Sequence, residues 1–321
     1  MAVVIPDGVR RTALERGEAG RAWLAGLPER LDRLRDRWAL SFDEVYGNGT
    51  AALVLRVRTA DRPAVLKLAA PGTGFGRQLR TLAAARGRGY VRLHAYDLSE
   101  HAALLEPLGS ALAATRLPVP RRLDVLAETL HEAWQVPVRA EPGPGKAEQL
   151  SHLLQSLWAR LGEPCSPELI AEALSAAADR AAAHRPEGSV VCHGDPHPGN
   201  ALAVASPRPG AHTGYVLVDP AGVVAEPAYD LGVAVARTDP HRVLAAPAPA
   251  DLVRADCARL AASCGVDPEA VWAWARTERV ASGLYLLRFG HPALGRAYLA
   301  AAEAVRRDRR PASRPVTARR T

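Results

Sequence analysis

The sequence predicts an α+β protein, with an N-terminal antiparallel sheet that carries a helix and a mostly helical C-terminal lobe. Short apolar segments separated by tight turns fill residues 41–70, which is the pattern of antiparallel strands. From about 111 to 186 and again from 250 to 305, Leu, Ala and Trp recur every three or four residues, as in amphipathic helices. At 321 residues the chain is long enough for two lobes.

The N-terminal lobe is expected at residues 1–108 and the helical lobe at 109–305. Residues 306–321 form a basic tail without an apolar face, which predicts disorder. The first strands are expected at 42–46, 51–57 and 64–69, a helix at 76–86, and two further strands at 89–97 and 101–109. Later helices are expected at 121–134, 147–162, 167–184, 250–264, 267–283 and 283–305, with Trp272, Trp274 and Tyr285 in the core.

The turn after the first strand is a candidate phosphate-binding element. Gly47, Asn48 and Gly49 form a Gly-x-Gly turn between antiparallel strands, where backbone amides can approach phosphate oxygens. An ordinary hairpin turn with the same residues would need no function. Both interpretations therefore remain open for this turn.

Lys67 in the third strand is a second candidate. Only two of the 41 Lys and Arg residues are lysines, and the other, Lys146, lies in a Pro/Gly-rich loop. A compact ammonium binds phosphate as a point charge, which a planar guanidinium does not reproduce. The pattern indicates that Lys67 binds nucleotide phosphates. The alternative is a strand-edge lysine whose ammonium reaches water along its aliphatic stem.

The most informative segment follows an expected strand at 189–192. It contains Asp195 and Asn200 in a loop that Pro196, Pro198 and Gly199 keep out of helical conformation. A second strand, at 214–218, ends at Asp219.

These three polar side chains fit Mg·ATP-dependent phosphoryl transfer. Asp195 can accept the proton of an attacking hydroxyl, and the oxygens of Asn200 and Asp219 suit a magnesium ion. The five-residue spacing from Asp195 to Asn200 is that of the protein-kinase catalytic loop.

Two alternatives use the same loop. His193, Asp195 and His197 could ligate the metal of a hydrolase, although the prolines prevent the helical spacing that pairs such ligands. A polar turn after a buried strand, without any function, is the other alternative.

The chain resembles the aminoglycoside phosphotransferases, a family with the protein-kinase-like two-lobe fold. The segments that match its catalytic loop, metal-binding turn and following helix are 190–202, 217–222 and 226–231. The segments that are similar to its streptomycin 6-phosphotransferase and hydroxyurea phosphotransferase branch are 5–8, 20–28 and 36–38. The resemblance extends from about residue 5 to about residue 235.

The resemblance implies a cytoplasmic antibiotic-resistance kinase that uses ATP and Mg²⁺ to phosphorylate a hydroxyl of a small molecule. Streptomycin O6 is the acceptor that it implies, and hydroxyurea or another antibiotic is the alternative. It also implies that the backbone from Glu106 to Leu108 binds adenine and that His193 and Asp230 support the catalytic loop. Glu226, with acids of the late helices, could favour a cationic aminoglycoside, and a solvated acid without a substrate role is the favoured alternative for this residue.

One part of the family pattern is missing. Kinases of this type pair the strand lysine with a Glu of the next helix. The segment 62–96 contains no Asp or Glu, and its helix offers Gln78 instead. Lys67 must then be oriented by Asp219, by nucleotide phosphates or by a carboxylate from elsewhere. A nucleotide-binding pseudokinase is therefore a further alternative.

Composition argues against other classes of protein. The net charge is +7, but much of it lies in the tail, and 5% aromatic residues leave few platforms for stacking bases, so nucleic acid is not an expected partner. The four cysteines show no Cys-x-x-Cys spacing, which favours reduced thiols in the cytosol. Charged residues interrupt every Ala-rich segment, so no membrane span is expected.

Overall fold

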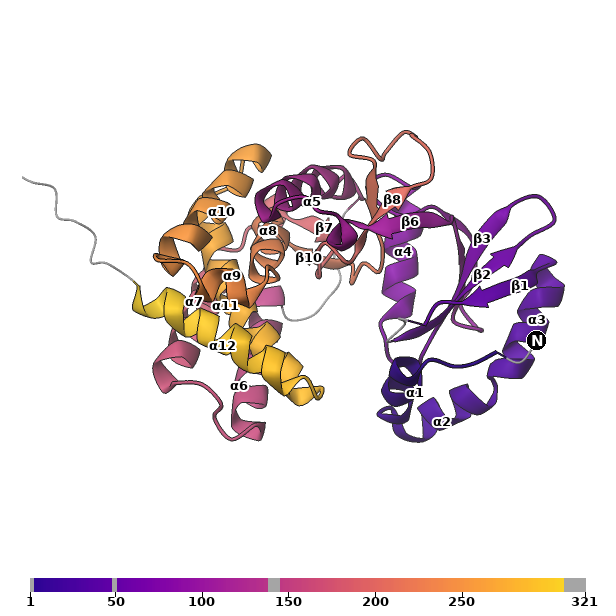
Figure 1. Ribbon diagram of the computed structural model, residues 1–321, viewed down its shortest axis with the longest axis horizontal. Coiled ribbons are helices and arrows are strands. Elements are labelled where there is room, and N and C mark those ends of the chain that lie inside the picture. Colours follow the sequence, from indigo (N-terminus) through magenta and orange to yellow (C-terminus); the bar gives the residue numbers. More distant parts are fainter. Residues whose placement is uncertain (1–2, 48–50, 138–144, 309–321) are drawn as a thin grey trace, which may run out of the picture. The chain divides into compact units, whose positions relative to one another are not determined.

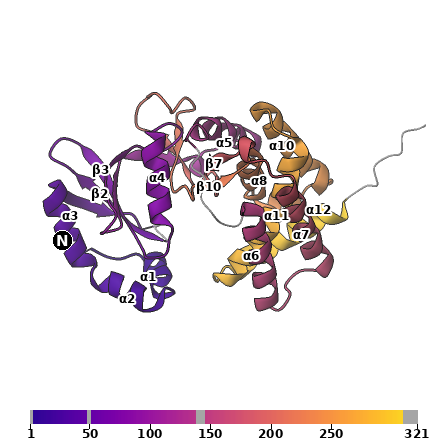
Figure 2. The same ribbon diagram turned by 180° about the vertical axis from the view of Figure 1, so that it is seen from behind.

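The computed structural model describes residues 3–47, 51–137 and 145–308. The chain divides into two compact units, which we treat separately. The first consists of residues 1–140 and 189–225, and the second of residues 141–188 and 226–321. Figure 1 labels their helices and strands, and Figure 2 shows them from behind.

A five-stranded antiparallel sheet forms the N-terminal part of the first unit (Figure 1). Its strand order is β1-β2-β3-β5-β4. The strands are β1 (Ser41–Val45), β2 (Ala52–Arg58), β3 (Pro63–Ala69), β4 (Leu93–Asp97) and β5 (Ala102–Leu105). Alternate residues of β2, among them Leu53, Leu55 and Val57, are fully buried, as the apolar alternation of this segment predicts. Helix α4 (Phe75–Ala85) follows β3. The expected sheet and helix are confirmed.

Three N-terminal helices complete the core of this sheet, and the sequence analysis did not assign them. They are α1 (Asp7–Leu14), α2 (Gly17–Ala25) and α3 (Leu27–Trp38). Leu27, Leu31 and Leu34 form one face of α3 and share a hydrophobic cluster with Leu53 and Leu66 of the sheet.

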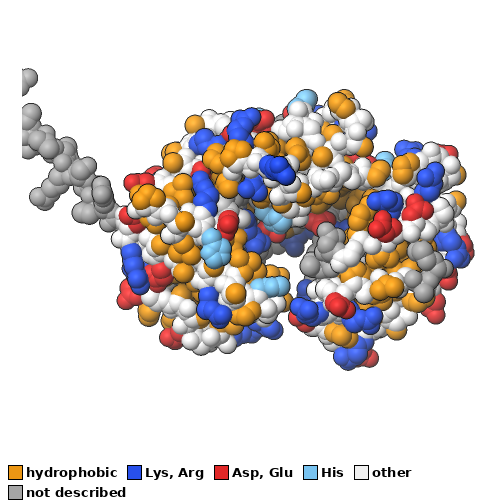
Figure 3. All heavy atoms as spheres, viewed as in Figure 1, with side chains coloured by type: hydrophobic (Ala, Val, Ile, Leu, Met, Phe, Trp, Pro, Cys, Tyr) orange, Lys and Arg blue, Asp and Glu red, His pale blue; other side chains and the backbone are white. Residues whose placement is uncertain are grey.

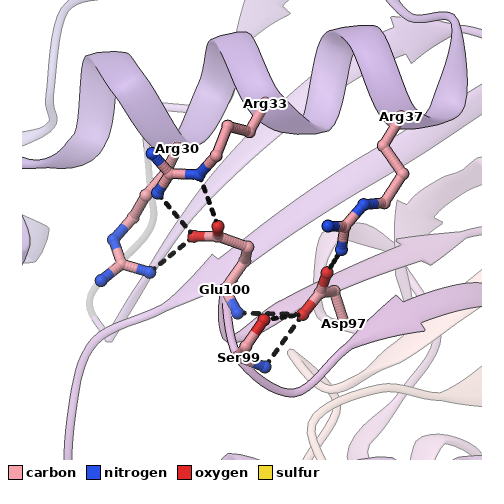
Figure 4. Close-up of polar contacts among 6 residues, drawn as sticks. All are labelled: Arg30, Arg33, Arg37, Asp97, Ser99 and Glu100. Carbon is pink, nitrogen blue, oxygen red and sulfur yellow. Dashed lines mark hydrogen bonds and ion pairs between the residues drawn. The ribbon is translucent and has the colours of Figure 1, made fainter.

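Ion pairs fix α3 to the turn between β4 and β5 (Figure 4). Glu100 accepts from Arg30 Nη1 at 2.8 Å and from Arg33 Nε at 2.6 Å, and its side chain is only 10% exposed. Arg37 pairs with Asp97 beside them. Asp97 Oδ1 also accepts from the backbone N–H groups of Ser99 (2.9 Å) and Glu100 (3.1 Å), so the turn itself is held in shape.

Two small sheets carry the candidate catalytic segment within the first unit. β6 (Leu108–Ala111), β8 (Ala201–Val204) and β9 (Tyr215–Leu217) form one, and β7 (Val190–Cys192) pairs with β10 (Val223–Ala225) in the other. The expected strand at 101–109 is therefore two strands in different sheets, because Pro107 lacks the N–H that a continuous ladder needs. The remaining elements of this unit are η1 (Leu112–Ala114) and α5 (Val119–Ala133), and η2 (Pro186–Gly188) belongs to the second unit.

The catalytic segment packs with the N-terminal sheet unit rather than with the helices that precede it in the sequence. Val91 N–H donates to Leu217 O at 3.0 Å, and Leu217 N–H donates to Gly89 O at 2.8 Å. Residues 89–91 of the expected strand at 89–97 therefore bond to β9, and β4 begins only at Leu93. The compact units thus differ from a division at residue 108, and the functional lobe boundary at 108 stays a prediction.

The second unit is helical. Its helices are α6 (Lys146–Arg160), α7 (Pro167–Ala182), α8 (Pro227–Ala236), α9 (Pro240–Leu244), α10 (Pro249–Cys264), α11 (Pro268–Arg288) and α12 (Pro292–Arg307). Proline opens six of them, where its missing N–H costs no hydrogen bond. Helix α11 packs against α7, α8, α10 and α12, and Trp272 and Trp274 are buried on it as expected. Tyr285 is 48% exposed, so the expectation that it is core is wrong.

The expected helix break at residue 283 is also wrong. Helix α11 continues through Gly283. The glycine is explained by close packing rather than by a helix end, because a Cβ there would lie 2.8 Å from the Leu299 side chain of α12. The chain turns at Gly290, whose φ is +82°. Helix α12 extends to Arg307, so the tail begins later than expected, and residues 309–321 lie outside the described part.

The described helices and surface bear on two further expectations. None of these helices is long and apolar enough to cross a membrane. On the face drawn in Figure 3, basic and acidic side chains of the described residues are interspersed. The expectation that nucleic acid is no partner stays a prediction.

Candidate phosphoryl-transfer site

The loop between β7 and β8 presents Asp195, whose side chain is 38% exposed. Gly194 precedes it with φ +91°, and a Cβ at Gly194 would lie 2.8 Å from Ala221 Cβ. The loop is held there because Ala221 N–H donates to His193 O at 2.7 Å. Glycine is therefore required by both the backbone conformation and the close approach of the next turn.

His193 supports this loop from the interior. It is fully buried, its Nε2 lies 2.7 Å from Val218 O, and its Nδ1 accepts from Asp195 N–H at 3.1 Å. The second bond requires a lone pair on Nδ1, so the ring is the tautomer that carries its proton on Nε2. Tyr90 stacks on the same ring, with centroids 6.0 Å apart.

The metallohydrolase alternative finds no support in this arrangement. Both ring nitrogens of His193 are engaged with the backbone, and Nδ1 of His197 accepts from Gly199 N–H at 3.0 Å. Within the part of the chain that the structure describes, no group of three His, Cys, Asp or Glu side chains could hold a metal ion.

Asn200 is fixed to the same loop as Asp195. Its Nδ2 donates to Asp195 O at 3.0 Å, and its backbone N–H donates to His197 O at 2.8 Å. Val218 N–H donates to Asn200 O at 2.9 Å, which joins the loop to the strand that leads to Asp219. Because the amide nitrogen of Asn200 serves the loop, Oδ1 is the atom with which this side chain can bind a cation.

Asp219 follows β9 in a left-handed conformation, with φ +60°. Such a conformation is uncommon outside glycine and concentrates at functional sites. Oδ1 of Asp219 contacts Lys67 Nζ and accepts from Gln78 Nε2 at 3.3 Å. The side chain of Asp219 is 53% exposed, and partial removal of its carboxyl from water would by itself raise the pKa; the Lys67 ammonium outweighs this effect and holds the pKa below its usual range.

Lys67 lies within β3, opposite Val54 of β2 and Ala103 of β5, and is 8% exposed. It is therefore not a strand-edge lysine that extends into water. Its ion pair with Asp219 spans 152 residues of sequence and confirms one of the three expected sources of orientation. Gln78 of α4 lies at this pair and donates to the carboxylate rather than accepting from the ammonium.

The turn after Asp219 packs directly on α4. Gly222 has φ +62°, and a Cβ there would lie 2.3 Å from Thr81 Oγ1 of α4. Helix α4 and the Asp219 turn can therefore approach each other closely enough for Gln78 to reach Asp219.

Glu106 and Leu108 lie at the connection between the two sheets of the first unit. Glu106 N–H donates to Arg92 O at 3.0 Å, and its carboxylate accepts from Arg92 N–H at 2.8 Å. Leu108 begins β6 and pairs with Val204. Gly47 lies in the turn after β1, whereas Asn48 and Gly49 lie outside the described residues. The nucleotide-binding roles of these residues stay predictions.

Arg208 holds this connection and was missed by the sequence analysis. Its guanidinium pairs with Glu106 and donates to Gly87 O at 2.7 Å and Tyr90 O at 3.0 Å. Its side chain is 7% exposed. As one arginine among 39 in a Pro/Gly-rich hairpin, it gave no sequence signal.

Two site candidates belong to the helical unit. Glu226 precedes α8 and is bound by Arg180 through bonds of 2.8 and 3.2 Å, and Trp274 Nε1 donates to it at 2.8 Å. Its charge is thus already compensated by a guanidinium. Asp230 is fully buried in the first turn of α8. The substrate role of Glu226 and the supporting role of Asp230 stay predictions.

The fold is that of kinase-like phosphotransferases. Aminoglycoside phosphotransferase APH(3'')-Id from Streptomyces rimosus, solved with ADP and streptomycin, has a TM-score of 0.51 and 16% identity, covering 78% of this chain and 96% of that one. Choline kinase LicA from Streptococcus pneumoniae has a TM-score of 0.57 and 14% identity, covering 87% and 99%. At these identities the similarity establishes the fold alone.

Sequence comparison gives the family. The profile of the aminoglycoside/hydroxyurea antibiotic resistance kinases matches residues 37–290, and this chain belongs to that family. It is 31% identical to the streptomycin 6-kinase of Streptomyces griseus over 305 residues, which are 94% of this chain and 96% of that protein. It is also 31% identical to the hydroxyurea phosphotransferase of Kitasatospora aureofaciens over 223 residues, 67% of this chain and 62% of that protein.

Proposed function

We propose that this protein transfers the γ-phosphoryl group of ATP to a hydroxyl of a streptomycin-type aminoglycoside, most directly to O6 of streptomycin. The observation that carries the proposal is the pairing of Lys67 with Asp219 beside a loop that joins Asp195 to Asn200. Full-length similarity to streptomycin 6-kinase supports the acceptor, since it covers 94% of this chain. Because ATP is the donor, we propose a cytoplasmic role in antibiotic resistance.

The donor atoms at Asn200 and Asp219 fit Mg²⁺. An amide oxygen and a carboxylate are hard ligands, and Mg²⁺ in phosphoryl-transfer sites takes few protein ligands together with phosphate oxygens and waters. Bound there, the ion would neutralise negative charge on the transferring phosphates. The low pKa of Asp219 keeps its carboxylate ionised and ready to bind a cation at neutral pH.

Each remaining side chain has a separate role in the proposal. Asp195 accepts or orients the proton of the acceptor hydroxyl, and Asn200 keeps it in place by binding its carbonyl oxygen. The Lys67 ammonium has three protons, so it can hold Asp219 and still donate to phosphate oxygens. The linker from Glu106 to Leu108 binds adenine, and Arg208 holds that linker in position.

Mass spectrometry of small molecules incubated with the protein, ATP and Mg²⁺ tests the acceptor. The panel contains streptomycin, other aminoglycosides and hydroxyurea, and we expect phosphorylated streptomycin. Asp195→Ala should abolish the product while nucleotide still raises the melting temperature. Asp61→Ala, which removes an exposed carboxylate from the β2–β3 turn, is the matched control.

The other outcomes distinguish the alternatives. Phosphorylation of hydroxyurea instead would favour the second relative, with which 67% of this chain aligns. Nucleotide binding without transfer to any compound would identify a pseudokinase and overturn the proposed activity. Product formation that survives Asp195→Ala would overturn the proposed role of Asp195.

A further inference from the structure

The helical unit contains a buried guanidinium with incomplete hydrogen bonding. Arg279 of α11 is 1% exposed. Its Nη2 donates to Val235 O at 2.9 Å and to Thr238 Oγ1 at 3.2 Å, at the C-terminal end of α8. Its Nη1 has no hydrogen-bond partner among the described residues. A buried donor without an acceptor is destabilising, so an additional acceptor beside Nη1 would stabilise the helical unit.

Nearby carboxylates do not supply it. Asp256 is the carboxylate whose charge acts on Arg279, but it already accepts from Arg242 at 2.6 Å and lies 3.5 Å from Arg259. Burial lowers the pKa of the Arg279 guanidinium to about 10, and the neighbouring Tyr298, Cys257 and Asp256 only partly oppose this effect. The positive charge of Arg279 is therefore poorly compensated in the interior.

A small cavity of about 20 Å³ lies beside Arg279. Arg276, Arg279 and Arg306 line it, and Glu172 is its one acidic lining residue. Glu172 lies 3.6 Å from Arg276, and the other lining side chains are apolar. The volume is enough for one small occupant, such as a water molecule or a monatomic ion. Arg276 pairs with Glu172 and Arg306 pairs with Glu303, so Arg279 is the lining cation that has no carboxylate partner among the described residues.

The chemistry of the lining selects the occupant. Guanidinium groups only donate hydrogen bonds, and the one acceptor side chain is already paired. A water molecule could accept from Nη1 but would leave the charge of Arg279 without a counter-ion, whereas an anion both accepts from Nη1 and supplies the missing negative charge. We propose that this cavity binds a small monovalent anion, of which chloride is the common example, and that the anion stabilises the helical unit.

The site can exchange with solvent. Glu172 and Arg276 also line a larger, open cavity of about 720 Å³ in the same unit. Their ion pair thus lies between the small cavity and the larger one. An anion can enter by displacing this pair, without separation of the helices α7, α10, α11 and α12 that form the walls.

Crystallography with bromide tests the occupant directly. Crystals of the wild-type protein in sodium bromide should show an anomalous peak in the cavity, beside Arg279. Density for water alone, without an anomalous peak, would overturn the proposal. This measurement requires no substitution and does not depend on the proposed kinase activity.

Thermal unfolding supplies the second readout. At equal ionic strength, we expect a melting temperature about 2–4 °C higher in sodium chloride than in sodium gluconate when chloride is well above its Kd. Arg279→Met should remove this difference, and Arg254→Met, which lines only the larger cavity, should keep it. No chloride effect on the wild type, or an effect that Arg279→Met retains, would contradict an anion at Arg279.

Discussion

At the scale of residues, the site is defined by which atom of each polar side chain is already committed. The amide nitrogen of Asn200 donates to Asp195 O, and both ring nitrogens of His193 form hydrogen bonds with backbone groups. Sequence spacing selected Asp195, Asn200 and Asp219 as candidates, because phosphoryl transfer restricts both the residue types and their separation; the structure joins Asn200 to Asp195 and Asp219 to Lys67, and their catalytic roles stay predictions. It could not predict that Gln78 donates to Asp219, since that contact depends on how α4 packs against a turn 141 residues away.

Lys67 has a natural control in this chain, which contains only one other lysine. Lys67→Met should leave Asp219 without its ammonium partner and lower the rate of phosphoryl transfer about 10²–10³-fold, as expected for loss of a cation at the reacting phosphate. Lys146→Met should leave nucleotide affinity unchanged. Steady-state rates and calorimetry of Mg·ATP binding measure the two effects, and a transfer rate of Lys67→Met equal to that of Lys146→Met would contradict the role of Lys67.

Gln78 allows a finer test. Gln78→Ala removes the bond that helps to hold Asp219, so the Mg²⁺ concentration for half-maximal activity should rise about three- to tenfold, equivalent to one modest hydrogen bond. The melting temperature should change little because Gln78 is only partly buried. An unchanged Mg²⁺ requirement would show that Gln78 does not position Asp219. Gln135→Ala, at the end of α5, is the control.

At the scale of elements, apolar periodicity located most strands and helices, and the errors have physical causes. Pro107 divides one expected strand, while Gly283 lies in a helix interior because α12 passes close to it. Local sequence does not distinguish a glycine that ends a helix from one that lets a second helix pack closely against the first. The apolar stripe of α3 was present in the sequence but had no expected partner until the sheet was known.

The clamp between α3 and the β4–β5 turn should contribute pH-dependent stability. Hydrogen bonding to Arg33 is the largest influence on Glu100 and lowers its pKa, while burial opposes this shift. A carboxyl with a lowered folded-state pKa stabilises the fold above its unfolded pKa, near 4.3, and loses that effect as pH falls through the folded value.

Glu100→Gln should therefore lower the melting temperature at pH 7 by about 2–6 °C, from the loss of charge-assisted hydrogen bonds. The difference from wild type should shrink as pH falls from about 5 to about 3. Glu44→Gln, in an exposed pair with Arg56, should shift it by about 1 °C at most. A Glu100→Gln difference that is constant with pH would contradict this account of the clamp.

At the scale of the whole molecule, a unit that contains the sheets and a helical unit are each compact. The order of elements along the chain predicted this α+β organisation. It did not predict that residues 189–225 pack with the N-terminal sheet, because the backbone bonds of residues 89–91 to β9 join segments far apart in sequence. Family membership, supported over residues 37–290, agrees with the fold.

One measurement tests the central claim most directly, namely that Asp195 acts on the acceptor while Lys67, Asn200 and Asp219 bind Mg·ATP. It compares single-turnover transfer to streptomycin and Mg·ATP affinity for the wild type and Asp195→Asn. We expect the transfer rate to fall about 10²–10⁴-fold, the range of general acid–base catalysis, with Mg·ATP affinity within about twofold of wild type. A transfer rate close to that of the wild type would contradict the account.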